Sequence, residues 1–209
     1  MTPMPVTPIR VLGAIVGVLL SVGLAAADVV TEWNVHAIAA TAVLPNSILQ
    51  SRTLAITHAA MSDAINAIER RYAPYAVDVT APAGASVDAA GAAAAHGVLV
   101  RLAPGHAATL DAALKSALAR VADERAREAG ASLGRQVAEQ MVERRARDGS
   151  DANVTVSDGT SVDRWVPTPP LSLAPILTQW GGVTPFLVPN AAQLPVKDPP
   201  GLPHGGVRA

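Results

Sequence analysis

The sequence lacks cysteine altogether and is poor in aromatic residues, with three Trp, two Tyr and one Phe among 209 residues. A chain without cysteine forms no disulfide bond, carries no thiol nucleophile and offers no thiolate ligand to a metal ion. A β-sandwich normally needs many aromatic and β-branched residues, whereas alanine is the commonest residue here. We therefore predict an all-α protein in which small side chains let the helices pack closely.

An excess of either charge is also lacking. Sixteen Lys and Arg residues face seventeen Asp and Glu residues, which leaves a net charge of −1. Proteins that bind nucleic acid or an anionic membrane surface usually carry a clear excess of positive charge. We therefore expect no nucleic-acid partner.

The first 27 residues have the pattern of an export signal. Arg10 is the only charged side chain before an apolar run over residues 11–24, which is shorter than the roughly 20 residues that span a bilayer. Small residues at positions 25–27 then precede Asp28, as signal peptidase requires. We expect cleavage after residue 27, Sec-type export to the periplasm or the extracellular space, and no membrane attachment of the mature chain. A retained signal anchor is the alternative.

Residues 28–150 predict an N-terminal domain of about five helices, because apolar residues recur there every three or four positions. The second helix is expected to begin at Ser47 or Ser51. Asp28 and Asp123 are predicted to cap the first and last helices, and His106 to cap the fourth. The expected helices cover residues 28–44, 47–73, 87–102, 107–121 and 123–147.

Each helix is expected to bury one apolar stripe. Alanine-rich residues 89–95 of the third helix should let a neighbouring helix approach closely. The last helix carries charges of both signs up to Arg145 on its outer face, which predicts a solvated face without a binding site. The predicted stripes are Val30, Trp33, Ala37, Ala40 and Leu44 in the first helix, Leu54, His58, Met61, Ile65, Ile68 and Tyr72 in the second, and Ala126, Leu133, Val137 and Met141 in the last.

Residues 151–209 form a segment of different character, which holds ten of the seventeen prolines. Prolines at this density prevent long helices and central strands. The segment also contains Trp165, Trp180 and Phe186, and large apolar rings in an irregular segment usually anchor it to a folded body. We predict a proline-rich segment that Trp165 and Trp180 dock against the helices.

Histidines, the commonest catalytic and metal-binding residues, are few and scattered. His58 has no partner at the i, i+4 spacing that a helical metal site needs. We interpret it, with His36 and His96, as a core imidazole that is hydrogen-bonded to a neighbour. The fifth, His204, lies in a stretch rich in proline and glycine.

Asp63 and Asn66 lie three residues apart on one helix face. A carboxylate and an amide do not make the acid–base pair of hydrolytic chemistry, so we predict that they tie the helix to a loop or to a neighbouring helix end. The sequence contains no phosphate-binding loop, nucleophile elbow or dinucleotide-binding turn. We therefore predict no catalytic, cofactor-binding or metal-binding residue.

Five segments nevertheless follow one another in a characteristic order between Asp28 and about Pro200. They are residues 58–68 with 71–75 (HAAMSDAINAI, RYAPY), 96–99 (HGVL), 108–111 (ATLD), 149–151 (GSD), and 164–170 with 180–186 (RWVPTPP, WGGVTPF). In this order they resemble bacterial vanadium-dependent haloperoxidase-like proteins. Those proteins belong to the wider group of type 2 phosphatidic acid phosphatase-like enzymes.

The resemblance implies a helical bundle in which Lys and Arg side chains, a Ser-Gly-His motif, and a further Arg and His bind vanadate or phosphate. The cations neutralise a tetrahedral oxyanion, and the histidines act as ligand, nucleophile or acid–base group. The implied activity is peroxide-dependent halide oxidation or phosphoester hydrolysis, with vanadate as the cofactor of a full-length haloperoxidase-like relative. None of these motifs occurs here, because the sequence has no Ser-Gly-His and no Arg-Pro, and its two lysines are Lys115 and Lys197.

Family members carry these motifs in a second helical half. We therefore expect this chain to correspond to the N-terminal half, truncated before the oxyanion-binding motifs and inactive alone, and we transfer no functional residue to it. One alternative is a non-catalytic helical partner that docks onto a separately encoded catalytic half through its alanine-rich face and aromatic tail. A signal-anchored helical protein, a homo-oligomer and a frameshifted gene product also stay open. The sequence favours neither halide oxidation nor phosphoester hydrolysis.

Overall fold

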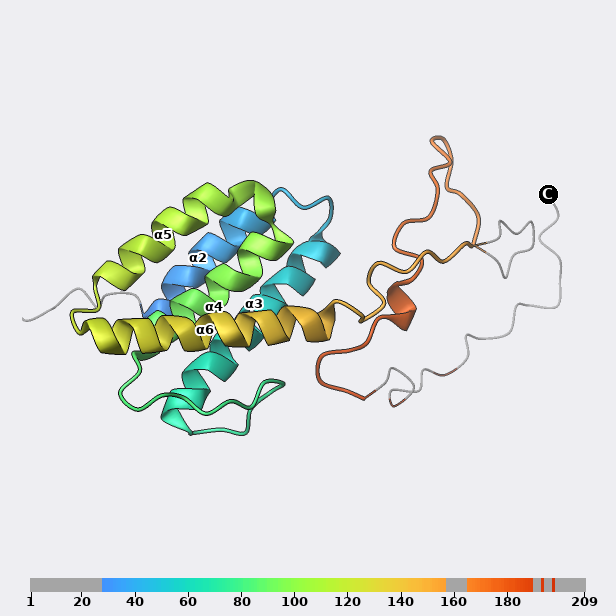
Figure 1. Cartoon of the computed structure of the whole chain (residues 1–209). Coiled ribbons are helices and arrows are strands. Elements are labelled where there is room, and N and C mark those ends of the chain that lie inside the picture. The colour runs from blue at the N-terminus through green and yellow to red at the C-terminus, as the bar shows by residue number, and fades with distance from the viewer. Residues whose placement is uncertain (1–27, 157–164, 190–192, 194–196, 198–209) are drawn as a thin grey trace, which may run out of the picture. The chain divides into compact units, whose positions relative to one another are not determined.

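The computed structural model describes residues 28–156 and 165–189, together with residues 193 and 197. Within these ranges the chain forms α-helices and short 3-10 helices, and no strand occurs in them. The predicted all-α class is therefore confirmed. The helices are α2 (Val29–Thr41), α3 (Ser47–Glu69), α4 (Val87–Leu102), η1 (Pro104–His106), α5 (Ala107–Ala119), α6 (Glu124–Arg145) and η2 (Trp180–Gly182) (Figure 1).

The described residues divide into two compact units, one up to Met141 and the other from Val142 onward. The first unit holds α2 to α5 and most of α6, and the second holds the last turn of α6 and the proline-rich segment. No helix in the described ranges is both long and apolar enough to cross a membrane. The predicted signal peptide, residues 1–27, and His204 lie outside the described residues.

Side-chain caps begin several of the helices. Asp28 Oδ1 accepts a hydrogen bond from the Thr31 backbone N–H (2.7 Å), and Asp123 Oδ1 accepts one from the Ala126 N–H (3.0 Å). Each bond satisfies an N–H group that has no partner within the first turn of its helix. Both predicted aspartate caps are therefore confirmed. The carboxylate of Asp28 is stabilised by this bond, which lowers the pKa of Asp28 from its ordinary value of 3.8.

Two further caps were missed and one was wrongly predicted. Asn46 and Ser86 accept hydrogen bonds from the third residue along, and so begin α3 and α4. Asparagine and serine are among the residues that most often cap helices in this way. His106 precedes α5 and makes no capping hydrogen bond with its side chain, because η1 leads directly into that helix.

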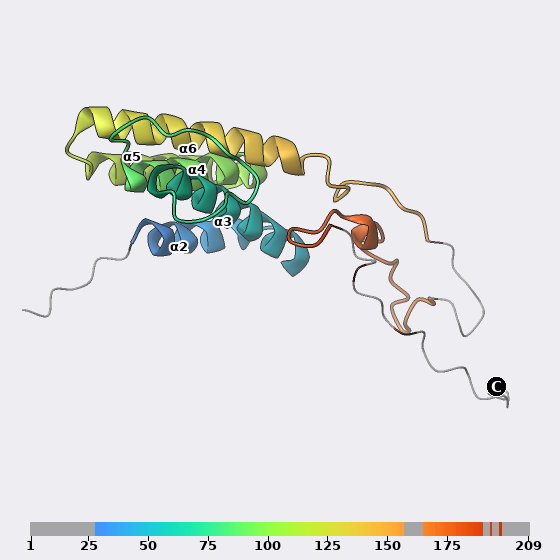
Figure 2. The same cartoon turned by 90° about the horizontal axis from the view of Figure 1, so that it is seen from below.

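Helix α4 lies at the centre of the first unit, in contact with α2, α3 and α5. Figure 2 shows α2 and α6 on opposite sides of it. Its residues 89–95 are all buried, and they are small enough for α6 to approach closely. A Cβ atom added to Gly134 would lie 2.2 Å from the carbonyl oxygen of Ala90, and one added to Gly130 would lie 2.3 Å from that of Ser86. The expected close approach of a helix to this run is confirmed.

In α2 the predicted Trp33, Ala37 and Ala40 are buried, which confirms the centre of that stripe, whereas its first member is not buried. Val29 is 9% exposed, whereas the predicted Val30 is 37% exposed. In α3 the buried face includes Ile56, Ala60 and the predicted Met61, whereas the predicted Leu54 and Ile65 are only partly buried along its edge. The last member of the predicted stripe, Tyr72, is 78% exposed. Alanines let the helix backbones approach, so the larger side chains lie beside the contact instead of within it. In α6 the predicted Leu133, Val137 and Met141 are buried.

Candidate functional site

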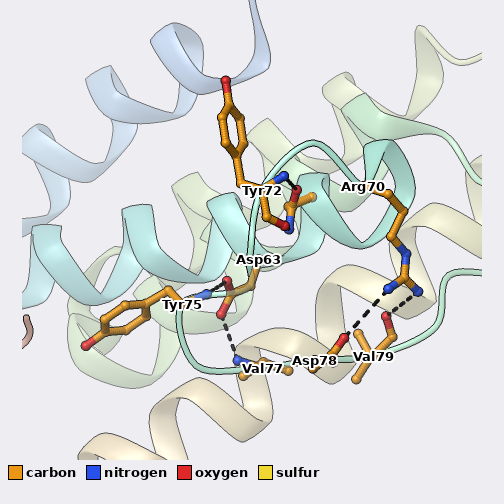
Figure 3. Close-up of polar contacts among 8 residues, drawn as sticks. Asp63, Arg70, Tyr72, Tyr75, Val77, Asp78 and Val79 are labelled. Carbon is orange, nitrogen blue, oxygen red and sulfur yellow. Dashed lines mark hydrogen bonds and ion pairs between the residues drawn. The ribbon is translucent and has the colours of Figure 1, made fainter.

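A buried carboxylate on α3 holds the loop that follows this helix (Figure 3). Asp63 is 1% exposed, and its two oxygens accept hydrogen bonds from the backbone N–H groups of Tyr75 (2.6 Å), Ala76 (2.9 Å) and Val77 (2.8 Å). Backbone donors that are bonded to a charged acceptor form the stronger class of protein hydrogen bonds. The oxygens of Asp63 are thus occupied by the backbone of its own loop.

Asn66, three residues later, completes this attachment. Its Oδ1 accepts a hydrogen bond from the Tyr72 N–H (2.8 Å), and its Nδ2 donates one to the Tyr72 carbonyl oxygen (2.6 Å). Arg70 ends α3 in the left-handed conformation (φ 55°), and its guanidinium donates to the Val79 carbonyl oxygen (3.2 Å). The predicted role of Asp63 and Asn66, tying the helix to a loop, is confirmed.

Two histidines join neighbouring helices of the first unit. His58 Nε2 on α3 lies 3.0 Å from Asn34 Oδ1 on α2. His96 Nε2 on α4 lies 2.7 Å from Asp111 Oδ1 on α5, and the His96 side chain is only 15% exposed. Hydrogen-bonded imidazoles of this kind match the predicted core histidines, so the interpretation of His58 and His96 is confirmed.

Trp33 packs between two of the imidazole rings. This side chain is fully buried, with its ring centre 5.3 Å from that of His36 and 6.3 Å from that of His96. The arrangement with His96 is edge-on, which suits the charge distribution of aromatic rings. The His36 ring thus contacts the buried Trp33 ring, and His36 itself is partly buried at the edge of the core.

A hollow of about 720 Å³ lies beside the N-terminal end of α2. Its lining includes Asp28, Glu32, His36 and Arg120, which are chemically the most reactive groups around it. Glu32 and Arg120 form an ion pair with each other. Across the described part of the chain, no three His, Cys, Asp or Glu side chains are close enough together to hold a metal ion.

In the second unit, a buried ion pair joins the end of α6 to the proline-rich segment. Arg145 Nη2 lies 2.8 Å from Asp148 Oδ2, and the two side chains are 6% and 2% exposed. Arg145 also donates hydrogen bonds to the carbonyl oxygens of Thr184 (2.8 Å) and Pro185 (3.4 Å). Its guanidinium carbon lies 4.0 Å from the centre of the Phe186 ring, a cation–π contact. We call these five residues the Arg145 clamp.

Backbone hydrogen bonds extend the clamp. The Thr184 N–H donates to the Asp148 carbonyl oxygen (2.8 Å), and the Ser150 N–H donates to Asp148 Oδ1 (3.0 Å). Gln179 Nε2 donates to the Ser150 carbonyl oxygen (2.7 Å). Residues 148–150 and 179–186, about thirty positions apart in the sequence, are thus held side by side.

The position of Arg145 corrects the sequence analysis, which placed this residue on the solvated face of the last helix. Arg145 follows Met141 by four residues, and so continues the buried line that begins with Leu133 and Val137. The prediction was wrong because the residue was judged by its charge and not by its spacing. Asp148, three residues later, was the available signal, because a buried arginine needs an acidic partner.

Two expectations concern docking surfaces. Residues 89–95 are buried in the first unit, so they form no free surface there, and association with a partner stays a prediction. Trp165 is 40% exposed and Trp180 is half-buried, and their docking against the helices stays a prediction. The aromatic ring with a described polar contact in this segment is instead Phe186, in the Arg145 clamp.

An oxyanion such as vanadate needs cationic side chains that are free to point at it. The buried guanidinium of Arg145 is directed at Asp148 and two carbonyl oxygens, and Lys115 lies on the exposed side of α5. The guanidinium of Arg145 is therefore already occupied by protein groups and is not available to an oxyanion. No family model, curated protein or solved structure matches the chain.

Proposed function

We propose that this chain is an exported helical scaffold, similar to the N-terminal half of vanadium-dependent haloperoxidase-like proteins, that associates with a catalytic helical half. The scaffold presents its proline-rich segment in a fixed conformation, on which the catalytic half packs. The oxyanion-binding Lys, Arg and His groups come from the catalytic half, so the scaffold contributes shape and takes no part in the chemistry.

The observation that carries this proposal is the Arg145 clamp. Removing two charges from water is costly, and an isolated buried pair is weak evidence for stability. Such a pair is better suited to fixing one conformation, because any other conformation that buries one charge without the other is strongly destabilised. The clamp joins residues next to GSD, at positions 149–151, to the WGGVTPF segment at positions 180–186. These are two of the segments that carry the family resemblance.

Other polar contacts of the first unit support the same role. Asp63 and Asn66, within HAAMSDAINAI, hold the loop that contains RYAPY. His96, which begins HGVL, is bonded to Asp111, which ends ATLD. The polar residues of the resembling segments thus bind one another and the backbone. Internal ties of this kind are what a scaffold requires.

Co-expression with a catalytic half tests the proposal. Residues 28–209 would be produced with the second half of a full-length haloperoxidase-like protein, the half that carries Ser-Gly-His. Complex formation would be followed by size-exclusion chromatography, and activity by vanadate-dependent bromination of monochlorodimedone. We expect each polypeptide to be inactive alone and the complex to be active.

The clamp supplies a matched pair of variants for this experiment. Arg145→Met should prevent formation of the active complex, whereas Arg144→Met, at the exposed neighbouring position, should leave it intact. Halogenation by residues 28–209 alone would contradict the proposal. So would the absence of any association at concentrations where both polypeptides are folded.

A further inference from the structure

The outer face of α2 is apolar and uncovered by the described helices. Val35, Ile38 and Val43 are 63%, 53% and 67% exposed, and Ala39 and Ala42 are also exposed. The spacing of Val35, Ile38 and Ala42 follows the helical repeat, so these residues form one continuous stripe. We call these five residues the α2 stripe.

The opposite face of α2 is buried in the bundle through Trp33, Ala37 and Ala40. The last part of α2, after His36, is therefore apolar on both faces, and no charged residue follows Glu32 before the helix ends. A helix that is apolar all round is normally covered on all sides. By contrast, the exposed positions of α6 include charged residues such as Arg135 and Glu139, as expected for a face in water.

We propose that the α2 stripe is the contact between two copies of this chain, which pack α2 against α2 in antiparallel fashion about a two-fold axis. The order of large and small side chains along the stripe carries this inference. With the axis between Ile38 and Ala39, Val35 of one copy faces Ala42 of the second, and Ile38 faces Ala39. Val35 and Ile38 then each meet a small side chain, whereas Val43 follows the end of α2 and takes no part in this pairing. The same surface serves both copies, as a two-fold contact requires.

Charge and size make the proposal more specific. The stripe carries no charge, and the whole chain has a net charge of −1, so repulsion between copies is small. Small residues at the contact bring helix axes toward the lower end of the usual range of about 8–10 Å. Helix α2 has 13 residues and is about 20 Å long, so its face is smaller than the roughly 800 Å² per partner of a standard interface. We therefore infer a weak, reversible dimer.

Sedimentation equilibrium of residues 28–209 over a range of micromolar concentrations measures the association. Ile38→Glu places a charge in the contact and brings two like charges near the two-fold axis, so it should raise the dimer dissociation constant by roughly 100-fold. Ile176→Glu is the matched control, because Ile176 is 77% exposed and lies outside the stripe. The control should dimerise like the unchanged chain, and circular dichroism should show both variants equally helical.

Ala39→Leu separates a specific fit from general stickiness. The larger side chain makes the stripe more apolar, so non-specific association would strengthen. In the proposed contact, however, a leucine at this position faces Ile38 of the second copy and overfills the space, so the dimer should weaken.

Single cysteines test the direction of packing, since the chain has none of its own. Position 38 lies next to the two-fold axis, so Ile38→Cys should form a disulfide-linked dimer on mild oxidation. Val35→Cys should not, because its two copies would be offset by about 10 Å along the helices, beyond disulfide reach.

Several outcomes would overturn the proposal, and none of them depends on a catalytic half. A monomer at every concentration would do so, as would equal dimerisation of the Ile38→Glu variant. Stronger association of the Ala39→Leu variant would show non-specific contact, and equal cross-linking at positions 35 and 38 would show a parallel pair. Occupation of the stripe by a different polypeptide, with no self-association, would identify another partner and refute the dimer.

Discussion

The two units of the chain maintain their conformations by opposite means. In the first unit, small residues let backbones touch, as where Gly134 of α6 meets the Ala90 carbonyl of α4. In the second unit, Arg145 and Asp148 form a buried ion pair that reaches out to backbone carbonyl groups. The backbone N–H and C=O groups of a regular helix bond to one another, so the helices need only pack together. A proline-rich segment cannot form these regular backbone hydrogen bonds, so side chains must bond to its backbone groups instead.

This difference predicts how damage spreads. Loss of fit between helices should weaken the whole first unit, because its core is continuous. Loss of a polar tie should release only the segment that it holds. The following variants test this distinction, in order of decreasing expected effect.

Arg145→Met should have the largest effect, because it removes the buried ion pair between Arg145 and Asp148. Breaking such a pair costs about 3–5 kcal/mol. We expect hydrogen exchange to rise over residues 148–150 and 179–186, while the first unit keeps its protection. Arg144→Met is the control and should change neither. Equal loss of protection in both units would break the comparison.

Asp63→Ala removes the acceptor of three backbone hydrogen bonds inside the first unit. We expect a loss of at least about 1.5–3 kcal/mol in the local stability of residues 72–77, which is the size of a single hydrogen bond to a charged group. Amide exchange at Tyr75, Ala76 and Val77 measures the effect, and the exposed Asp78→Ala variant should show none. Unfolding of the whole helical unit at the same denaturant concentration would show that the tie is not local.

Gly134→Ala adds one carbon atom where the nearest backbone oxygen would be 2.2 Å away. Overpacking of a close contact costs about 1–3 kcal/mol, and here the helices must move apart along their length. Urea unfolding followed by helical circular dichroism should show the loss over the whole first unit. Gly105→Ala, with no atom within 4 Å of the added carbon, should be close to neutral. A loss confined to the residues around position 134 would contradict the idea of a continuous core.

Asp28 should contribute the smallest effect, through pH. Its pKa is lowered because the Thr31 backbone N–H stabilises the ionised form. A lowered pKa in the folded state gives stability that is present above the ordinary value of 3.8 and is lost as pH falls through the folded-state value. Asp28→Asn keeps a capping oxygen without titrating, so its unfolding midpoint should fall less steeply than that of the unchanged chain below about pH 4. If the unfolding midpoints of the variant and the unchanged chain fell equally with pH, Asp28 would not contribute to the acid sensitivity of the fold.

The helices were predictable from the sequence because their signals are local. Asp28 and Asp123 are caps at the predicted positions, and α4 has the predicted bounds, residues 87–102. The burial of α3 was less predictable, since its face depends on the alanines of α4 across the contact. The predicted stripe followed the largest side chains, such as Leu54 and Ile65, and these lie at the edge of the buried face of α3.

Among the polar contacts, too, the local ones could be predicted from the sequence and the long-range ones could not. The role of Asp63 and Asn66 followed from their spacing on one helix near a loop. The clamp did not, because Arg145 binds Thr184 and Pro185, which are about forty positions away. Periodicity within a helix reveals which face is buried, but it does not reveal a distant backbone carbonyl that makes burial of a charge acceptable.

The contact at Gly134 also restricts how this protein can evolve. Apart from silent changes to another glycine codon, a single-base change turns a glycine codon into one for alanine, serine, valine, cysteine, aspartate, glutamate, arginine or tryptophan, or into a stop codon. Every one of these amino acids carries a Cβ atom, and at Gly134 that atom meets the Ala90 carbonyl. No single-base replacement at this position preserves the helix spacing. A lineage that replaces this glycine must first, or simultaneously, change how α4 and α6 pack.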